Sequence, residues 1–172
     1  VRVTEHDSKR TQSMTTEEVA QFWYQKFPWK GTTLKEAEEM VVQRVMELIS
    51  MKDCATLEIR PFIKKLKSQD YKIGLATNSP EKIIPTVLKK TRTTDLFDMV
   101  SSADFEMKGK PHPAIYLNTA KKLKVMPEEC AVIEDSETGM EAAKKAGMTV
   151  IAYTKGNKDI SLQWADYKID RF

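Results

Sequence analysis

Residues 130–147, CAVIEDSETGMEAAKKAG, join a short apolar run to a helix of small residues through two adjacent carboxylates. The run at 130–134 is predicted to be a buried strand, and the helix is predicted to begin at about Glu137. Glu134 and Asp135 then lie side by side at the tip of that strand, where their charges repel and burial is costly without a positive group nearby. A metal ion, a lysine or a helix N-terminus could compensate them, and which of these does so decides the chemistry.

Short apolar runs alternate with helical segments on both sides of this stretch. Strands are predicted at residues 71–77, 97–102, 130–134, 148–154 and 167–169. Helices are predicted at residues 59–69, 79–91 and 111–124 and from about residue 137. Ser79 is the predicted N-cap of the helix at 79–91, and Pro85 is expected to kink that helix or to delay its start. The alternation predicts an α/β fold, a Rossmann-like parallel sheet with helices on both faces.

The helix after residue 136 carries a stripe of small side chains at helical spacing. Its members are Gly139, Ala142, Ala143 and Ala146. Small residues let a helix approach a sheet closely, so we interpret the stripe as packing, and Gly147 as the C-terminal stop of the helix.

The first third of the chain is predicted to be a helical hairpin. Apolar residues recur at helical spacing over residues 15–27, and the stretch FPWKG at 27–31 interrupts the pattern. Thr33 and Glu36 form a capping-box pair that begins a second helix, which runs to about Lys52. The apolar stripe of this second helix consists of Leu34, Ala37, Val41, Val45, Leu48 and Ile49.

Composition and charge narrow the classes of function. The 172 residues suffice for one domain, or for one domain plus a small accessory piece. The formal net charge is only +3 and the basic residues are scattered, which argues against a nucleic-acid partner. Cys54 and Cys130 are far apart and fit neither a zinc site nor a disulfide framework. No apolar run has the roughly 18 to 20 residues that span a bilayer and no signal peptide is visible, so with the sparse cysteines we expect a cytoplasmic protein with no membrane partner. We also expect a monomer.

Polar residues follow two of the predicted strands at the edge where parallel sheets bind ligands. The residues immediately past these apolar runs are Thr77, Asn78 and Ser79 for the first and Glu134, Asp135 and Ser136 for the second. The loop KGKPHP at 108–113 lies between the two runs and carries Lys108 and Lys110. If the two strands are parallel neighbours, hydroxyls, a lysine and two carboxylates converge on one rim of the sheet.

Together these groups suit a phosphate ester and a divalent cation. A hydroxyl from Thr77 or Ser79, with the N–H groups that begin the next helix, can donate to phosphate oxygens. Lys110 can supply a point charge to the phosphate and to nearby carboxylates. Glu134 and Asp135 offer the hard oxygen ligands that Mg²⁺ prefers, and the metal would neutralise both acids. Each feature also has a plainer explanation, since the first strand end fits an ordinary turn and the acids fit a helix N-terminus.

Three stretches in this order, GLATNS, KGKPHPAIY and VIEDSETGMEAAKKAGM, resemble the second, third and fourth motifs of the haloacid dehalogenase-like hydrolases. The pattern resembles the phosphoglucomutase/phosphatase branch, in which a helical cap follows the first motif. The resemblance implies a Rossmann-like core at 57–172 and part of the cap at 1–56. The stretch FWYQKFPWKG at 22–31 is similar to the cap of phosphatases that act on 2-deoxyglucose-6-phosphate and hexitol phosphates.

The resemblance also implies roles for the matched residues. Thr77 would hydrogen-bond the transferring phosphoryl group, with Asn78 and Ser79 beside it as substrate-binding residues. Lys110 would hold both the phosphate and the carboxylate of the nucleophile. The metal ligands would be Glu134 and Asp135, which would hold Mg²⁺ directly or through water.

The family's first motif, a strand that ends in Asp-x-Asp, does not occur among the 172 residues. One Asp of that motif is the nucleophile that becomes an aspartyl-phosphate, and the other is the general acid and base. The closest pairs, Asp95 with Asp98 and Asp166 with Asp170, have other spacings and follow no apolar strand in the right place. We therefore expect the nucleophile and a central strand to lie upstream of Val1, and the strands beside the missing one to have unpaired edges.

The implied function is a Mg²⁺-dependent phosphatase acting on a small phosphorylated sugar, with this chain alone inactive. Two alternatives stay open at the level of sequence. One is a phosphomutase or a phosphatase of another small metabolite. The other is a non-catalytic relative that binds a phosphorylated ligand or a protein, if the chain is complete as written.

Overall fold

The computed structural model describes residues 4, 7, 10–11, 14–52, 58–157 and 159–172. It contains the strands β1 (Gly74–Thr77), β2 (Met99–Ser102), β3 (Ala131–Glu134), β4 (Thr149–Tyr153) and β5 (Tyr167–Ile169). Every paired strand runs parallel to its neighbour. The α/β fold with parallel strands is therefore confirmed.

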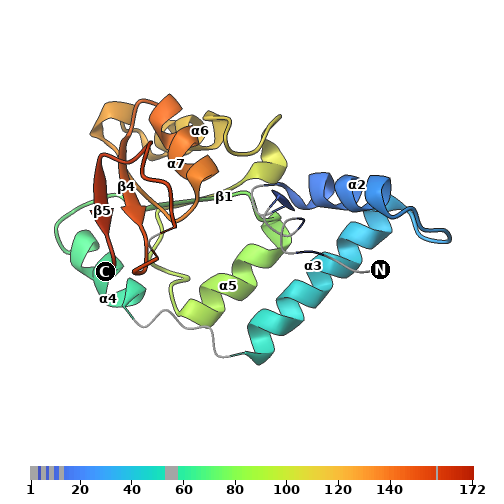
Figure 1. The fold of residues 1–172 in the computed structure, drawn as a ribbon. Coiled ribbons are helices and arrows are strands. Elements are labelled where there is room, and N and C mark those ends of the chain that lie inside the picture. The colour runs from blue at the N-terminus through green and yellow to red at the C-terminus, as the bar shows by residue number, and fades with distance from the viewer. Residues whose placement is uncertain (1–3, 5–6, 8–9, 12–13, 53–57, 158) are drawn as a thin grey trace.

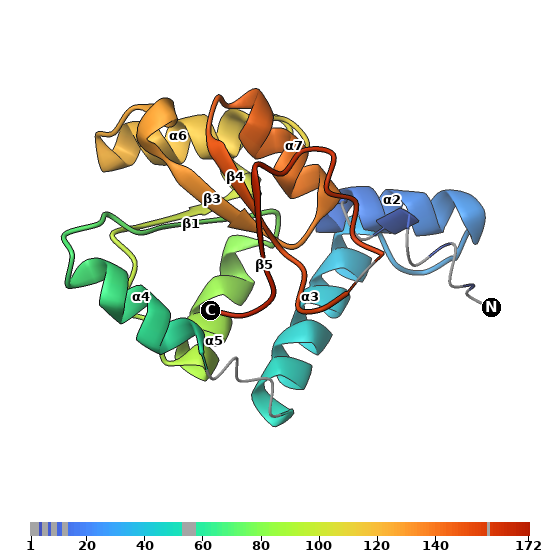
Figure 2. The same ribbon diagram turned by 60° about the vertical axis from the view of Figure 1, so that its left-hand side comes forward.

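Helices lie on both sides of these strands. The helices of this part of the chain are α4 (Ile59–Lys67), α5 (Ile84–Thr91), α6 (Ala114–Leu123) and α7 (Glu137–Lys145), with the short 3-10 turns η1 (Glu81–Ile83), η2 (Ala103–Phe105) and η3 (Pro127–Glu129). Figure 2 shows α6 and α7 along one side of the strands, and α4 and α5 on the other. None of the described helices is long and apolar enough to cross a lipid bilayer.

The strands form two separate ladders. One ladder pairs β1 with β2, and the other has the order β3-β4-β5. The ladders lie beside each other because α6 packs on β1 and β2, α7 packs on β3 and β4, and the two helices touch. Within the described residues no strand pairs with the second edge of β1 or of β3. Neither strand has a fully buried residue, whereas Val150 and Ala152 of β4 are completely buried.

The core of the larger ladder confirms the packing interpretation of the small-residue stripe. Ala142 and Ala143 have no exposed surface and lie in one cluster with Ile115 and Val150. Such small side chains allow close approach between helix and sheet, and close packing rewards it through dispersion contacts. Gly147 follows α7 with φ of +79°, a left-handed conformation that suits glycine at a helix end.

The start of α5 differs from the sequence prediction. Ser79 is not a helix N-cap, because Pro80 precedes the 3-10 turn η1 and α5 begins only at Ile84. Pro85 lies in the first turn of α5, where its missing N–H is tolerated, so the predicted delay is confirmed. The carboxylate Oδ2 of Asp104 accepts a hydrogen bond from the backbone N–H of Glu81 at 2.8 Å. A residue distant in sequence thus binds the first free N–H of η1, the role predicted for Ser79.

The N-terminal helices α2 (Thr16–Lys26) and α3 (Leu34–Met51) pack against each other beside the α/β part (Figure 1). Both begin with a capping box, as predicted for Thr33 and Glu36. The predicted apolar stripe of α3 is only partly right, because Val41 is half exposed and the neighbouring Val42 is buried. The helix contacts α5 and η1 as well as α2, so its packed face is rotated from the expected one. The predicted boundary between residues 56 and 57 lies outside the described residues.

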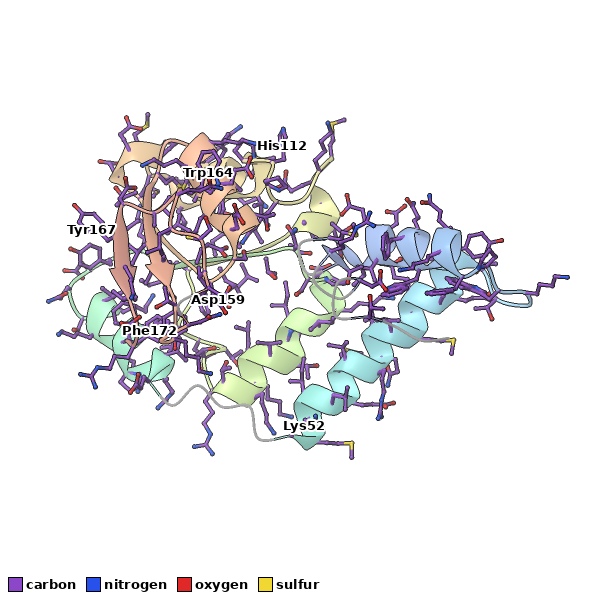
Figure 3. All side chains as sticks on the ribbon, in the orientation of Figure 1. Lys52, His112, Asp159, Trp164, Tyr167 and Phe172 are labelled. Carbon is purple, nitrogen blue, oxygen red and sulfur yellow. The ribbon has the colours of Figure 1, made fainter. Side chains whose placement is uncertain are left out.

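Aromatic rings pack the C-terminal residue Phe172 against β4 and α4. Phe172 stacks on Tyr153 of β4 with ring centroids 4.6 Å apart, and it lies 5.2 Å from the ring of Phe62 on α4. Figure 3 shows Phe172 near α4, well away from His112 at the loop that leads into α6. Burial of such rings stabilises the junction of α4 with the second ladder.

Asp98 and Asp166 each form hydrogen bonds with two other segments of the fold, and their carboxyl pKa values affect how its stability changes with pH. Asp98 accepts hydrogen bonds from Lys67 Nζ at 2.6 Å and from the backbone N–H of Ile73 at 2.7 Å, and these lower the pKa of its carboxyl. Lys144 Nζ and the backbone N–H of Val150 lower the pKa of Asp166 in the same way. A depressed carboxyl pKa contributes stability above the ordinary value of 3.8, and that contribution is lost as the pH falls through the folded-state pKa.

We therefore expect the thermal unfolding midpoint to stay nearly constant from neutral pH to about pH 5 and to fall below about pH 4. Differential scanning calorimetry across this range measures the change. Asp98→Asn and Asp166→Asn should each reduce the acid-dependent drop, whereas Asp95→Asn, on an exposed side chain, should leave it intact. An acid-dependent drop of the same size in all three variants would contradict this explanation.

Candidate functional site

Lys110 lies where the two ladders meet. Its Nζ donates to the backbone carbonyl of Ala76 on β1 at 3.0 Å and forms an ion pair with Glu134 Oε1 at the end of β3. The side chains of Lys110 and Glu134 are only 8% and 11% exposed. A buried ammonium thus compensates a buried carboxylate and links the end of β1 with the end of β3. The predicted convergence of Lys110 with the acidic end of the third strand is what the structure shows.

Asn78 positions the loop that carries this lysine. Its side-chain Oδ1 accepts the backbone N–H of Lys110 at 3.0 Å, and its Nδ2 donates to the backbone carbonyl of Lys110 at 3.4 Å. The amide therefore engages both backbone groups of the same residue. The predicted substrate-binding residue also has a structural task, which is to hold the loop against the end of β1.

Thr77 and Ser79 lie at the same rim. Thr77 is the last residue of β1, and its Oγ1 accepts the backbone N–H of Ser79 at 3.0 Å. A hydroxyl that accepts in this way keeps its own hydrogen for donation to a ligand. The Ser79 side chain is exposed, and its carbonyl accepts the hydroxyl of Ser102 at 2.8 Å, which connects the ends of β1 and β2.

The carboxylate of Glu134 is held by several groups at once. Oε1 accepts the hydroxyl hydrogen of Tyr116 in addition to its contact with Lys110. Oε2 accepts from Ser136 Oγ at 3.0 Å, and Ser136 in turn accepts the backbone N–H of Gly139 as the N-cap of α7. Each of these contacts fixes one of the two carboxylate oxygens in place. One orientation of Glu134 is therefore strongly preferred.

Gly139 has a role beyond the predicted close packing on the sheet. A Cβ atom at this position would lie 2.1 Å from Glu134 Oε2 and 2.2 Å from its carboxyl carbon. The glycine leaves the space in the first turn of α7 that the carboxylate occupies. The interpretation of Gly139 as a residue for helix–sheet packing is thus incomplete, because its lack of a side chain also makes room for the carboxylate of Glu134.

Tyr116 is the residue of this site that sequence reasoning missed. It lies on α6 with 6% of its surface exposed, and Lys110 Nζ lies 4.8 Å from the centroid of its ring. Burial, and next the negative charge of Glu134, raise the pKa of Tyr116 far above its usual range, so the hydroxyl stays a hydrogen-bond donor. A tyrosine on the buried face of a predicted helix needs a polar partner for its hydroxyl, and this was the available signal.

Asp135 differs from its neighbour in being exposed. Its charge also contributes to the raised pKa of Tyr116, which places it near the cluster around Glu134. Two adjacent carboxylates with one exposed suit Mg²⁺, which usually binds one or two carboxylates and completes its shell with water and phosphate oxygens. Among the described residues, no group of three or more His, Cys, Asp and Glu side chains could hold a metal together. Glu134 and Asp135 therefore fit Mg²⁺ when water and phosphate oxygens supply the remaining ligands.

The α2–α3 hairpin lies against this rim. A Cβ on Gly109 would lie 3.0 Å from Thr15 Cγ2, so the residue that caps α2 touches the lysine-bearing loop. A hollow of about 1170 Å³ opens nearby, lined by much of α3 together with Pro80, Lys82 and Asp104. The predicted catalytic and metal-binding residues do not line this hollow, so it is a neighbour of the site and not the site itself.

The sequence is similar to one hydrolase family and to several enzymes that act on sugar phosphates. The family described as haloacid dehalogenase-like hydrolase matches residues 9–147. Hexitol phosphatase B of Escherichia coli K12 is 34% identical over 153 residues, which cover 88% of this chain and 69% of that protein. Beta-phosphoglucomutase of Bacillus subtilis is 39% identical over 92 residues, which cover 54% of this chain and 40% of that enzyme.

A similar solved structure is that of beta-phosphoglucomutase from Clostridium difficile. Its TM-score is 0.82 at 26% identity, and the superposition covers 99% of this chain and 77% of that one.

Proposed function

The chain belongs to the haloacid dehalogenase-like hydrolases, and from that premise we propose that the full-length protein is a Mg²⁺-dependent phosphatase of a small phosphorylated sugar. The observation that carries the proposal is the buried pair of Lys110 and Glu134 at the meeting point of β1 and β3, beside the exposed Asp135. A buried lysine with a carboxylate on one side and an open rim on the other suits the binding of a phosphate dianion.

We propose further that the nucleophilic Asp lies outside these 172 residues, on a strand that pairs with both β1 and β3. In the part of the chain that the structure describes, one edge of each of these two strands has no pairing partner, and this supports the placement. A strand between them, parallel to both, would end beside Lys110 Nζ, which already contacts each ladder. An aspartate at that end could attack phosphorus and form an aspartyl-phosphate while a second aspartate protonates the leaving sugar oxygen. The second aspartate would then take a proton from the water that hydrolyses the aspartyl-phosphate to inorganic phosphate.

The residues of this chain would bind and orient the substrate. Thr77, Asn78 and Ser79 would donate to the phosphoryl oxygens, while Lys110 has one N–H left after its bonds to Ala76 and Glu134. The residues that would hold Mg²⁺ are Asp135 and Glu134, directly or through water. When bound, the metal would neutralise negative charge on the phosphate and on the carboxylates.

The test is hydrolysis of a panel of sugar phosphates by the full-length protein with Mg²⁺. Asp135→Asn should lower kcat/KM by at least about a hundredfold, because electrostatic stabilisation of a phosphoryl group contributes several kcal/mol. EDTA should abolish turnover, and Asp95→Asn, on an exposed side chain away from the rim, should keep it. Turnover that survives both EDTA and Asp135→Asn would refute the proposal.

A phosphomutase is the second candidate, favoured by the similarity to beta-phosphoglucomutases. Product analysis separates the two, because a mutase yields an isomeric sugar phosphate and a phosphatase yields inorganic phosphate. An upstream coding sequence without Asp-x-Asp would instead favour the non-catalytic binding protein. The monomeric state and the cytoplasmic location stay predictions.

A further inference from the structure

We propose that Tyr116 is a positioning residue for phosphoryl transfer, which holds Glu134 and Lys110 in one fixed arrangement. This inference rests on the proposed function. Tyr116 reaches both partners at once, because its hydroxyl donates to Glu134 Oε1 while its ring lies 4.8 Å from Lys110 Nζ.

The hydroxyl of Tyr116 limits how Glu134 can pair with Lys110. A carboxylate oxygen has two lone-pair positions, and on Oε1 one is used by Tyr116 and the other by Lys110. Ser136 occupies a position on Oε2, so the carboxylate cannot turn both oxygens toward the ammonium. Lys110 thus keeps a single contact with Glu134, a second with the carbonyl of Ala76, and one N–H for an anionic ligand.

The ring of Tyr116 makes a separate contribution. It covers the ammonium of Lys110 with an aromatic face, a favourable contact for a cation that is largely removed from water. With only 6% of its surface exposed, the tyrosine also keeps water away from this ion pair. The two contributions are separable, because Tyr116→Phe keeps the ring and removes only the hydroxyl.

The position of Tyr116 in the fold explains why one residue can reach both partners. Helix α6 packs on β1 and β2 and touches α7, which packs on β3 and β4, so the side chain of Tyr116 can reach the end of β3 from the neighbouring ladder. Its neighbour Ile115 is completely buried in the core, which anchors this turn of the helix. Phenylalanine would fill nearly the same volume, so Tyr116→Phe is expected to fold.

The experiment compares wild type, Tyr116→Phe and Tyr153→Phe in the full-length protein. Tyr116→Phe should lower kcat/KM for the best sugar phosphate by about 10- to 100-fold, the effect of one hydrogen bond to a charged group, through a lower kcat together with weaker phosphate binding. The second measurement does not depend on turnover. Inorganic phosphate with Mg²⁺ should raise the unfolding midpoint of wild type, and it should raise that of Tyr116→Phe by less than half as much. Tyr153→Phe, on a tyrosine that stacks on Phe172, should match wild type in both measurements.

A double-mutant cycle tests whether Tyr116 acts through Glu134. In a Glu134→Gln background, adding Tyr116→Phe should lower kcat by no more than about twofold further, because the group that the tyrosine orients is already altered. Independent, multiplicative losses would overturn the proposal. So would a Tyr116→Phe protein with a lower unfolding midpoint but wild-type kcat and a wild-type response to phosphate. A wild-type protein that neither turns over a sugar phosphate nor responds to phosphate would overturn the proposed function itself, and the positioning role with it.

Discussion

Replacing Lys110 by methionine should lower kcat/KM of the full-length protein for its sugar phosphate by about a thousandfold or more. The change removes the buried positive charge between β1 and β3 and leaves Glu134, 11% exposed, without its ion-pair partner. Breaking a buried pair from one side typically costs about 3–5 kcal/mol of unfolding free energy, so a clear loss of stability should accompany the loss of activity. Steady-state kinetics and urea unfolding measure the two effects.

Two companion variants sharpen this prediction. Lys121→Met, on an exposed lysine of α6, removes the same charge away from the rim and should keep both activity and stability. Lys110→Arg keeps the charge but should recover little activity, because the planar guanidinium does not fit the space of a compact ammonium between Ala76 and Glu134. More than a tenth of wild-type activity in Lys110→Met would show that this lysine does not act on the phosphate.

Gly139→Ala should lower kcat/KM by about a hundredfold although alanine is the better helix former. The new Cβ would lie 2.1 Å from Glu134 Oε2. The clash is with the end of a flexible side chain, so the carboxylate can move and the backbone of α7 need not. That movement breaks the bonds of Glu134 with Lys110, Tyr116 and Ser136.

Stability should fall together with activity. The helix gains about 1 kcal/mol from alanine, which offsets part of the roughly 3–5 kcal/mol lost when the buried Lys110–Glu134 pair separates, so we expect the free energy of unfolding to fall by about 2–4 kcal/mol. Thr138→Ala, one residue earlier in the same turn, is the matched control and should be nearly neutral. In a Glu134→Ala background the clash partner is gone, so Gly139→Ala should change kcat/KM by less than about threefold. A fully active Gly139→Ala protein would contradict the conclusion that Gly139 leaves the space that the Glu134 carboxylate occupies.

Much of the architecture was predictable because its causes are local. The apolar runs at 130–134 and 148–154 predicted strands, and the residues that follow an apolar run in a parallel sheet must lie at the carboxyl edge. That reasoning was enough to bring Lys110 and the acidic pair to one rim. It could not predict that Ser79 is no helix cap, because the carboxylate that takes over this task belongs to Asp104 in a distant loop.

The sequence by itself determined the succession of strands and helices along the chain, the capping box that begins α3, and the identity of the polar groups at the strand ends. Only the tertiary structure decided which atoms of those groups meet. Tyr116 and Gly139 join the site because α6 packs on the first ladder, α7 packs on the second, and the two helices touch, so that each approaches Glu134 from its own side. Periodicity reports which face of a helix is buried, whereas the contacts of a carboxylate oxygen depend on how two helices that are distant in sequence pack together.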